Sequence, residues 1–285
     1  MTPPTPTRPG LSPPVIIVGM HRSGTTLVTQ LLQHAGLHPG ADLEKNAESR
    51  FFLNCNRWLL QQAGGRWDHP EPIQAVLDHS PLTDAFAASL QTLLNSPRAR
   101  RFRFPDASQP WGWKDPRNTW TLPLWLRLFP DARVVHVTRH GVDVARSLVT
   151  RNQRILDDKL PLQSSDVIRF TGGKKRIAKI RDGLSPACAT LGGAFDLWHR
   201  YLQAAETHLA EAPLQHSLRY EDLLTEPTTV LTQLLEFCQL TADPDAVLQR
   251  EQLNATRCYA YRHDPDAARF AQDHAPTLAA FGYDA

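Results

Sequence analysis

Residues Val15–Thr26 read VIIVGMHRSGTT, and the expected fold class follows from this segment. Its first four residues are apolar and β-branched, as in a buried parallel strand. A glycine-containing turn comes next, and Leu27, Leu31 and Leu32 then recur at helical spacing. A strand, a glycine loop and a helix in this order predict a phosphate cradle, because N–H groups at the start of the helix point at the anion.

The loop differs from the ATP-binding pattern GxxxxGK[ST] at its lysine position, where Thr25 stands, and its cation comes earlier, at Arg22. The lysine of that pattern reaches the outer phosphates of a nucleoside triphosphate, and the hydroxyl after it holds Mg²⁺. A ligand without a γ-phosphate has less charge to neutralise, so an arginine and hydroxyl donors suffice without a metal. The candidate anion-binding residues are Arg22, Ser23, Gly24, Thr25 and Thr26. The alternative is an ordinary Gly-Thr turn beside a surface arginine.

Three further segments repeat or extend this architecture. Arg133–Thr138 is β-branched and precedes a helical pattern from Gly141. Gln215–Arg219 is a weaker strand, and a helix is expected to start at Pro227. Trp111–Lys114 reads as another strand end. We therefore expect an α/β chain with a P-loop-type three-layer fold, in which helices flank a central, mostly parallel sheet.

Length and charge bound the organisation and the partners. A chain of 285 residues can form one large domain, which we expect over residues 15–285 after a disordered tail at 1–14. Helical or loop insertions are expected at about 41–110 and 153–190, where the strand and helix patterns fade. The net charge of +2 argues against a protein that binds nucleic acid through an overall positive electrostatic field.

Several other classes are excluded by composition. No stretch approaches the roughly 20 apolar residues of a membrane span, and the Pro-rich and Thr-rich start does not read as a secretory signal. The four cysteines form no CxxC pair, so neither a metal site nor a dense disulfide framework is expected. A soluble protein in the reduced cytoplasm fits these observations best.

The loop Arg22–Thr26 (RSGTT) resembles the 5′-phosphosulfate loop of the sulfotransferase superfamily, in the form found in tyrosylprotein sulfotransferases and many bacterial sulfotransferase-like proteins. That resemblance implies 3′-phosphoadenosine 5′-phosphosulfate as co-substrate and a hydroxyl as acceptor. A 3′-phosphate needs a second anion site. Arg139 at a strand end and Ser147 eight residues later can face one phosphate, and their spacing is similar to the 3′-phosphate motif of the family.

Three more elements resemble parts of that superfamily. Lys114-Asp-Pro is similar to an element of tyrosylprotein sulfotransferases, which implies that Lys114 stabilises charge on the leaving phosphate. Glu48-x-x-Phe-Phe resembles an element of heparan-type sulfotransferases, which implies that Glu48 is the base that deprotonates the acceptor. The lysine that precedes the glutamate in those enzymes is Ala47 here, and Glu44 is the second candidate for the base. The segment starting at Tyr220 (YEDL) follows a late strand in many members, which implies that Tyr220 approaches the adenine or the phosphosulfate. Without the resemblance, these side chains read as a strand-end lysine, a helix-capping glutamate and a packing tyrosine.

Two other functions compete with a sulfotransferase: a P-loop nucleoside or nucleotide kinase, and a non-catalytic nucleotide-binding module. The acceptor can be a small molecule, a carbohydrate or a peptide, and the oligomeric state is open. Arg169–Arg181 carries six cations and no acid. It reads either as a solvated face or as a lid over the bound donor or an anionic acceptor.

Overall fold

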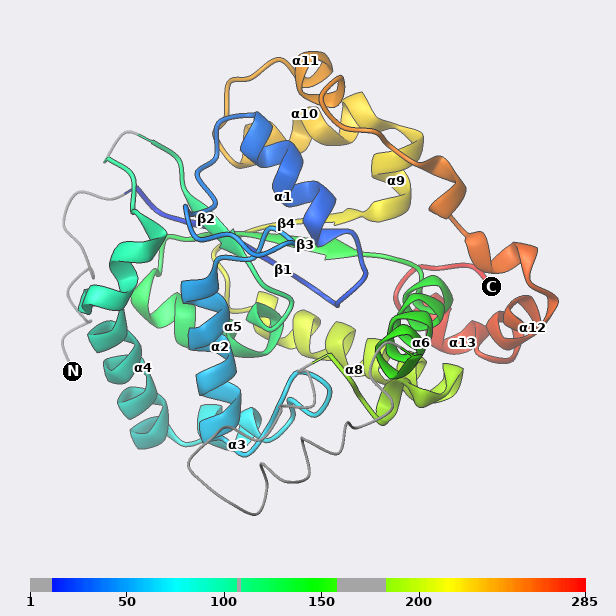
Figure 1. Cartoon of the computed structure of the whole chain (residues 1–285), viewed down its shortest axis with the longest axis horizontal. Coiled ribbons are helices and arrows are strands. Elements are labelled where there is room, and N and C mark those ends of the chain that lie inside the picture. Colours follow the sequence, from blue (N-terminus) through cyan, green and yellow to red (C-terminus); the bar gives the residue numbers. More distant parts are fainter. Residues whose placement is uncertain (1–11, 107–108, 158–182) are drawn as a thin grey trace.

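The computed structural model of the chain describes residues 12–106, 109–157 and 183–285. Its centre is a four-stranded parallel sheet in the order β2-β1-β3-β4 (Figure 1). The strands are β1 (Val15–Gly19), β2 (Gly112–Lys114), β3 (Arg133–Thr138) and β4 (Leu214–Arg219). All four lie where strands were predicted, and the expected α/β fold class is confirmed.

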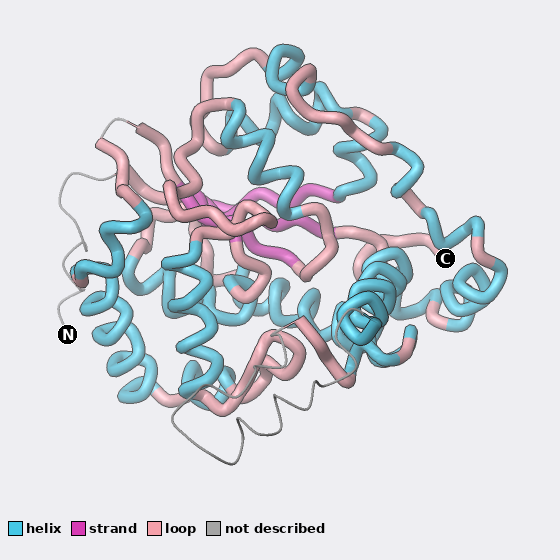
Figure 2. The backbone as a smooth tube through the Cα atoms, viewed as in Figure 1, coloured by secondary structure: helices cyan, strands magenta, loops and turns pink. Residues whose placement is uncertain are grey.

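Alternate side chains of the strands enter two separate cores. Val15 and Ile17 of β1 pack into the first core, whereas Ile16 and Val18 pack into the second. Helices cover both faces, so the sheet forms the middle of three layers (Figure 2). The helices of the first core are α1 (Thr25–His34), α9 (Tyr220–Thr225), α10 (Pro227–Phe237) and α11 (Pro244–Leu248).

The second core is larger and contains most of the aromatic side chains. Phe52 of α2 stacks on Trp113 of β2 with ring centroids 3.9 Å apart. Its helices are α2 (Arg50–Gln62), α3 (Ile73–Leu77), α4 (Ser80–Asn95), α5 (Asn118–Leu128), α6 (Gly141–Asp157), α8 (Leu191–Leu209), α12 (Pro265–Asp273) and α13 (Ala275–Ala280). The short 3₁₀ turns are η1 (Pro97–Phe102), η2 (Ala187–Ala189), η3 (Ala255–Arg257) and η4 (Ala260–His263).

The order of the strands creates a crevice. β1 lies between β2 and β3. The next strand in the sequence, β2, therefore pairs with one edge of β1, and the following strand, β3, pairs with its other edge. Helix α1 follows β1 on one face, and α6 follows β3 on the opposite face (Figure 1). Ligands of open α/β sheets bind at such a point, beyond the carboxyl ends of the two strands. The loops after β1 and β3 are therefore placed to form a site together.

The expected tail and insertions lie outside the sheet, and the structure describes part of each. Residues 41–106 contain α2, α3, α4 and η1. Two residues of the expected tail hydrogen-bond to the sheet region. The Ser12 oxygen accepts from the Trp111 Nε1–H at 2.7 Å, and the Pro14 oxygen accepts from the Arg133 N–H at 2.9 Å. The rest of the expected tail, most of the 153–190 insertion and the whole of the basic segment Arg169–Arg181 lie outside the described residues.

Candidate functional site

The loop between β1 and α1 depends on two glycines. Gly19 has φ 141°, and a side chain there would clash with the backbone oxygen of Val137 in β3. Gly24 has φ 97°, and a side chain there would enter the ring of Tyr220. Residues with a Cβ rarely adopt such φ angles, and here they would also collide. The loop therefore passes close to β3 and Tyr220 before α1 begins at Thr25.

This loop presents free N–H groups at the start of α1. The Ser23 hydroxyl donates to the Met20 oxygen at 2.8 Å, and the Ser23 N–H donates to the same oxygen at 3.2 Å. Ser23 therefore holds the shape of the loop in this structure. The N–H groups of Gly24, Thr25 and Thr26 make no hydrogen bond to any described residue. Free N–H groups at the positive end of a helix dipole can bind an anion, and we call these three groups the cradle.

Two arginines and a serine meet beside this cradle. Arg22 donates through Nε to the Ser147 hydroxyl at 2.8 Å. Arg139 donates through Nη1 to the backbone oxygen of Arg22 at 3.3 Å and through Nη2 to that of Arg257 at 2.7 Å. Its guanidinium lies 4.8 Å from the centre of the Tyr220 ring. The structure thus brings Arg22, Arg139, Ser147 and Tyr220 together, and neutral groups accept most of their hydrogen bonds.

A buried ion pair stands on the other side of the cradle. The Lys114 ammonium lies 2.9 Å from Glu48 Oε1 and 3.5 Å from the Thr26 hydroxyl, and the Lys114 side chain is 1 % exposed. Burial raises the pKa of Glu48, and the ammonium of Lys114 opposes that shift. Glu44, the reserve candidate, instead pairs with Arg50 at 3.0 Å near the surface. Of the two glutamates, only Glu48 faces the cradle.

A buried polar network fixes Glu48 relative to Lys114. Ser49 caps α2 by accepting from the Phe52 N–H at 3.4 Å, which sets the start of the helix directly after Glu48. Further along α2, Asn56 donates to Asp115 at 2.9 Å and to Asn118 at 2.7 Å. Asp115 follows Lys114 directly, so hydrogen bonds between fully buried side chains join α2 to the end of β2. Displacement of either element costs these buried bonds.

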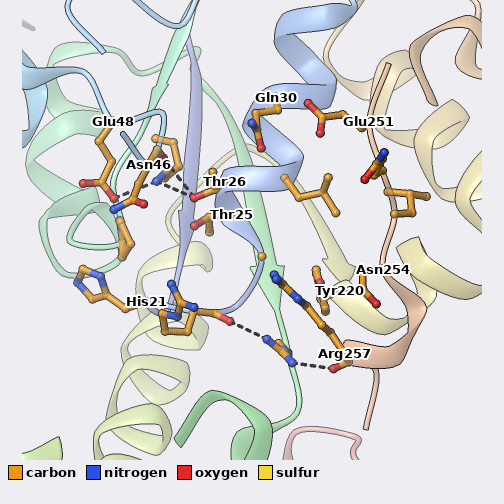
Figure 3. Close-up of a pocket in the computed structure, with 18 of the residues that line it drawn as sticks. His21, Thr25, Thr26, Gln30, Asn46, Glu48, Tyr220, Glu251, Asn254 and Arg257 are labelled. Carbon is orange, nitrogen blue, oxygen red and sulfur yellow. Dashed lines mark hydrogen bonds and ion pairs between the residues drawn. The ribbon is translucent and has the colours of Figure 1, made fainter. Parts of the chain in front are cut away.

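These groups line one cavity of about 740 Å³. Figure 3 shows Glu48 and Asn46 on one side of the loop, and Tyr220, Asn254 and Arg257 on the other. The lining residues are His21, Arg22, Gly24, Thr25, Thr26, Leu27, Gln30, Asn46, Glu48, Lys114, Pro116, Arg139, Arg151, Tyr220 and residues 251–257. Ser23 and Ser147 are not in this lining, and Ser147 contacts it through Arg22.

His21 lies inside the loop and is neutral. Burial lowers its pKa well below the usual value, and the cations Arg117, Arg151 and Lys114 lower it further. Its ring packs edge-on against Trp67 with centroids 4.8 Å apart. The buried Nε2 atom has no hydrogen-bond partner among the described residues. His21 thus adds an uncharged polar atom to the wall of the cavity.

The described part of the chain shows neither a metal-binding cluster nor a membrane-spanning helix. No group of three or more His, Cys, Asp or Glu side chains there is arranged to hold a metal ion. No described helix is both long enough and apolar enough to cross a membrane. The four cysteines are free thiols, and Cys55, Cys188 and Cys238 are buried.

The comparison that decides the family covers most of the chain. Residues 13–245 match the model of the sulfotransferase family. The chain belongs to the sulfotransferase family. A sulfotransferase from Alicyclobacillus acidocaldarius shares the fold with a TM-score of 0.51 at 15% identity, over 96% of this chain and 97% of that one. The sulfotransferase domain of the Synechococcus PCC 7002 olefin synthase aligns over 98% and 97% of the two chains, with 18% identity and a TM-score of 0.47.

Among curated sequences, an uncharacterized protein of Aquifex aeolicus (strain VF5) is 26% identical over 245 residues. The match takes in 83% of this sulfotransferase and 26% of the relative. This sulfotransferase therefore spans about a quarter of the length of that relative.

Several cavity residues of the sulfotransferase carry no local sequence signal. Asn46 accepts from the Thr26 hydroxyl through its backbone oxygen at 3.2 Å, and it comes from a loop that showed no periodicity. Gln30 is one of several polar residues on α1. Arg257 follows the last predicted helix, and only its charge marks it. Arg151 lies four residues after Ser147, so the two side chains lie on the same face of a helix. That spacing was the signal that could have identified Arg151.

Proposed function

We propose that this sulfotransferase moves a sulfuryl group from 3′-phosphoadenosine 5′-phosphosulfate to an acceptor hydroxyl. The position of Lys114 carries the proposal. Thr25 replaces the lysine of an ATP loop, and Lys114 of the neighbouring strand brings its ammonium to 3.5 Å from the Thr26 hydroxyl. A cation placed beside the cradle, and not within the loop, suits a donor that ends at a single phosphate and a sulfuryl group.

The donor is assigned to one end of the cavity. In this proposal the N–H groups of Gly24, Thr25 and Thr26, with Arg22, bind the 5′-phosphosulfate. Arg139 and Ser147 bind the 3′-phosphate, and Tyr220 supports them from below the Arg139 guanidinium. We call the group Arg22, Arg139, Ser147, Tyr220 and Arg257 the donor end. We call the group His21, Glu48, Lys114 and Arg151 the reaction end.

The chemical step is an in-line displacement at sulfur. The acceptor oxygen forms a bond to sulfur while the bond from sulfur to the bridging phosphate oxygen breaks. The hydroxyl proton passes to Glu48, and the electron pair of the broken bond stays on the leaving phosphate. Lys114 stabilises this developing charge, and its stabilisation is greatest in the transition state.

The ion pair between Glu48 and Lys114 connects these two roles. While Lys114 pairs with Glu48, its ammonium lowers the proton affinity of the carboxylate. When the ammonium turns toward the leaving phosphate, its opposing effect is lost, and burial together with the neighbouring Asp115 carboxylate raises the proton affinity of Glu48. A stronger base is thus produced at the moment when the acceptor proton must leave.

Two alternatives make different predictions. A nucleoside or nucleotide kinase needs a loop lysine and a metal-holding acid, and Thr25 argues against it. A non-catalytic nucleotide-binding module has no need of a buried lysine and a glutamate beside the cradle. We also propose a single domain over residues 15–285 in the reduced cytoplasm, acting on a small-molecule, carbohydrate or peptide acceptor.

The test is to incubate the protein with 3′-phosphoadenosine 5′-phosphosulfate and phenolic, sugar and peptide hydroxyl acceptors. Release of 3′-phosphoadenosine 5′-phosphate that depends on an acceptor is the expected result. Lys114→Ala provides the control for contaminating activity. Formation of ADP from ATP and Mg²⁺, without turnover of the phosphosulfate, would establish the kinase instead.

A further inference from the structure

The reaction end contains a cation that the sulfuryl step does not use. Arg151 of α6 lines the cavity, and its guanidinium lies 4.6 Å from the centre of the Trp67 ring. Its Nη2 atom donates to the Gly183 oxygen at a long 3.4 Å. Its Nε atom is buried and has no hydrogen-bond partner among the described residues. Arg151 is thus held in place by a ring and one weak bond, with donors to spare.

Neighbouring cations differ from Arg151 in having a carboxylate. Lys114 pairs with Glu48 at 2.9 Å. Arg117 pairs with Asp115 at 2.9 Å, which leaves Arg151 without an ion pair in the described part of the chain. Burial lowers the pKa of Arg151, and the nearby Arg22 and Arg117 lower it as well. An arginine nevertheless keeps its proton in a protein, so the charge stays, and no carboxylate of the described residues pairs with it.

An uncompensated, largely buried guanidinium is costly unless a ligand supplies the opposite charge. Arg22 and Arg257 are the other cavity arginines without an ion pair among the described residues, and both lie at the donor end, where the proposed phosphosulfate donor supplies the opposite charge. Arg151 is placed differently, because Trp67 contacts both the Arg151 guanidinium and the His21 ring. Arg151 also lies close enough to His21 to lower its pKa, as Lys114 does. It therefore belongs with His21 and Lys114, where an acceptor must approach.

We propose that Arg151 binds an anionic group of the acceptor, so that this enzyme sulfates molecules carrying a carboxylate, phosphate or sulfate near the reacting hydroxyl. This inference rests on the proposed function, since it assumes that the donor occupies the other end. A guanidinium suits the role because its planar donors bind an oxyanion through two parallel hydrogen bonds. Stacking on Trp67 orients that plane before the acceptor arrives.

The experiment titrates an anion into protein whose donor end is already filled. Wild type, Arg151→Gln and Arg154→Gln are saturated with 3′-phosphoadenosine 5′-phosphate and titrated calorimetrically with sulfate at constant ionic strength. Arg154 is exposed on the same helix, so its variant controls for the loss of one charge. We expect sulfate to bind wild type and Arg154→Gln equally and Arg151→Gln about tenfold or more weakly. Phosphate and acetate titrations extend the comparison to the other two anion types.

Three results would overturn the inference. The first is that none of the three anions binds the saturated wild type. The second is that Arg151→Gln binds the anions as wild type does. The same holds if Lys114→Ala abolishes anion binding and Arg151→Gln does not, because the anion would then occupy the position of the sulfuryl group. The third is that Arg151→Gln weakens the bisphosphate itself about tenfold, which would make Arg151 a donor residue.

Two further measurements keep the outcomes distinct. Arg151→Lys retains the charge, so partial recovery of sulfate binding is expected, whereas a purely structural role would give no recovery in a folded variant. If the bisphosphate does not bind wild type, the proposed donor site fails. The same variants titrated without nucleotide then decide whether Arg151 is an anion site.

Discussion

The donor end and the reaction end of the cavity hold their cations in different ways. At the donor end, Arg22 donates to a serine hydroxyl, and Arg139 donates to two backbone oxygens and, at a longer 3.4 Å, to the Asp143 carboxylate. At the reaction end, Lys114 is neutralised by Glu48 within a buried pair. Positive charge is thus available to a ligand at Arg22 and only weakly paired at Arg139, whereas the charge of Lys114 is neutralised by Glu48 until that carboxylate gains a proton.

This difference separates binding from catalysis. A charge available in the free enzyme stabilises the bound donor and the transition state alike. A charge released only as the proton moves stabilises the transition state selectively, and selective stabilisation raises turnover. We therefore expect substitutions at the donor end to act mainly on affinity and substitutions at Lys114 and Glu48 to act mainly on rate.

The largest effect is expected for Lys114→Ala. Single-turnover sulfuryl transfer should slow by about 10²–10³-fold, because the leaving phosphate loses its electrostatic partner. Affinity for 3′-phosphoadenosine 5′-phosphate, measured by calorimetry, should fall much less. Equal losses in rate and affinity would show that Lys114 acts in the ground state.

Because Lys114→Ala leaves a buried carboxylate unpaired, its stability must be followed. Loss of one partner of a buried pair costs about 3–5 kcal/mol. The double variant Lys114→Met with Glu48→Gln removes both charges, so its thermal midpoint should recover toward wild type. A double variant as unstable as Lys114→Ala would mean that the pair itself is not the source of the loss.

Glu48→Gln should give the next largest effect. We expect turnover to fall by about 10²-fold, with unchanged affinity for the bisphosphate product, because the amide cannot accept the acceptor proton. Glu44→Gln is the matched control, since Glu44 pairs with Arg50 at the surface. If Glu44→Gln lost activity and Glu48→Gln did not, the assignment of the base would be wrong.

The pH profile of the wild type sharpens the same assignment. Burial raises the pKa of Glu48, and only the deprotonated carboxylate is a base. Activity should therefore fall as the pH drops through this raised pKa, with a midpoint above about 4.3, the usual value for glutamate. The residual activity of Glu48→Gln should lack this acid limb. An acid limb that persists in Glu48→Gln would assign it to another group.

Smaller effects are expected at the donor end. Arg22→Ala and Arg139→Ala should each weaken the bisphosphate by about 1.5–3 kcal/mol, since each removes a charge-assisted contact. Ser147→Ala should cost only about 0.5–1.5 kcal/mol, because it removes one neutral hydrogen bond. Calorimetry across the three variants measures the order. Wild-type affinity in both arginine variants would contradict the two anion sites.

Three residues of the donor end, Arg22, Arg139 and Tyr220, were candidates from sequence because each comes shortly after a strand. Arg22 and Arg139 come after β1 and β3, whose apolar, β-branched runs mark them clearly, and parallel strands end at the same edge. The reaction end is harder to predict because its residues come from four separate segments. Lys114 and Glu48 were found only through short resemblances, and the Asn56 network that joins their elements has no linear signal.

Other elements were missed because tertiary contacts stabilise them. Helix α9 has six residues, too few to show a helical period. Helices α12 and α13 were not predicted, although Ala271 and Leu278 are fully buried in the second core. Arg257 reaches the cavity only because the segment 251–257 crosses back over the site. Such placement depends on the whole fold and leaves no local pattern.

The central claim, that the cradle is built for a phosphosulfate donor and not for ATP, is tested most directly by calorimetry. The protein is titrated with 3′-phosphoadenosine 5′-phosphate, with ATP and with ATP plus Mg²⁺. The account predicts that the bisphosphate binds most tightly, and that Mg²⁺ does not improve the binding of ATP. Preferential binding of ATP with Mg²⁺ would contradict it.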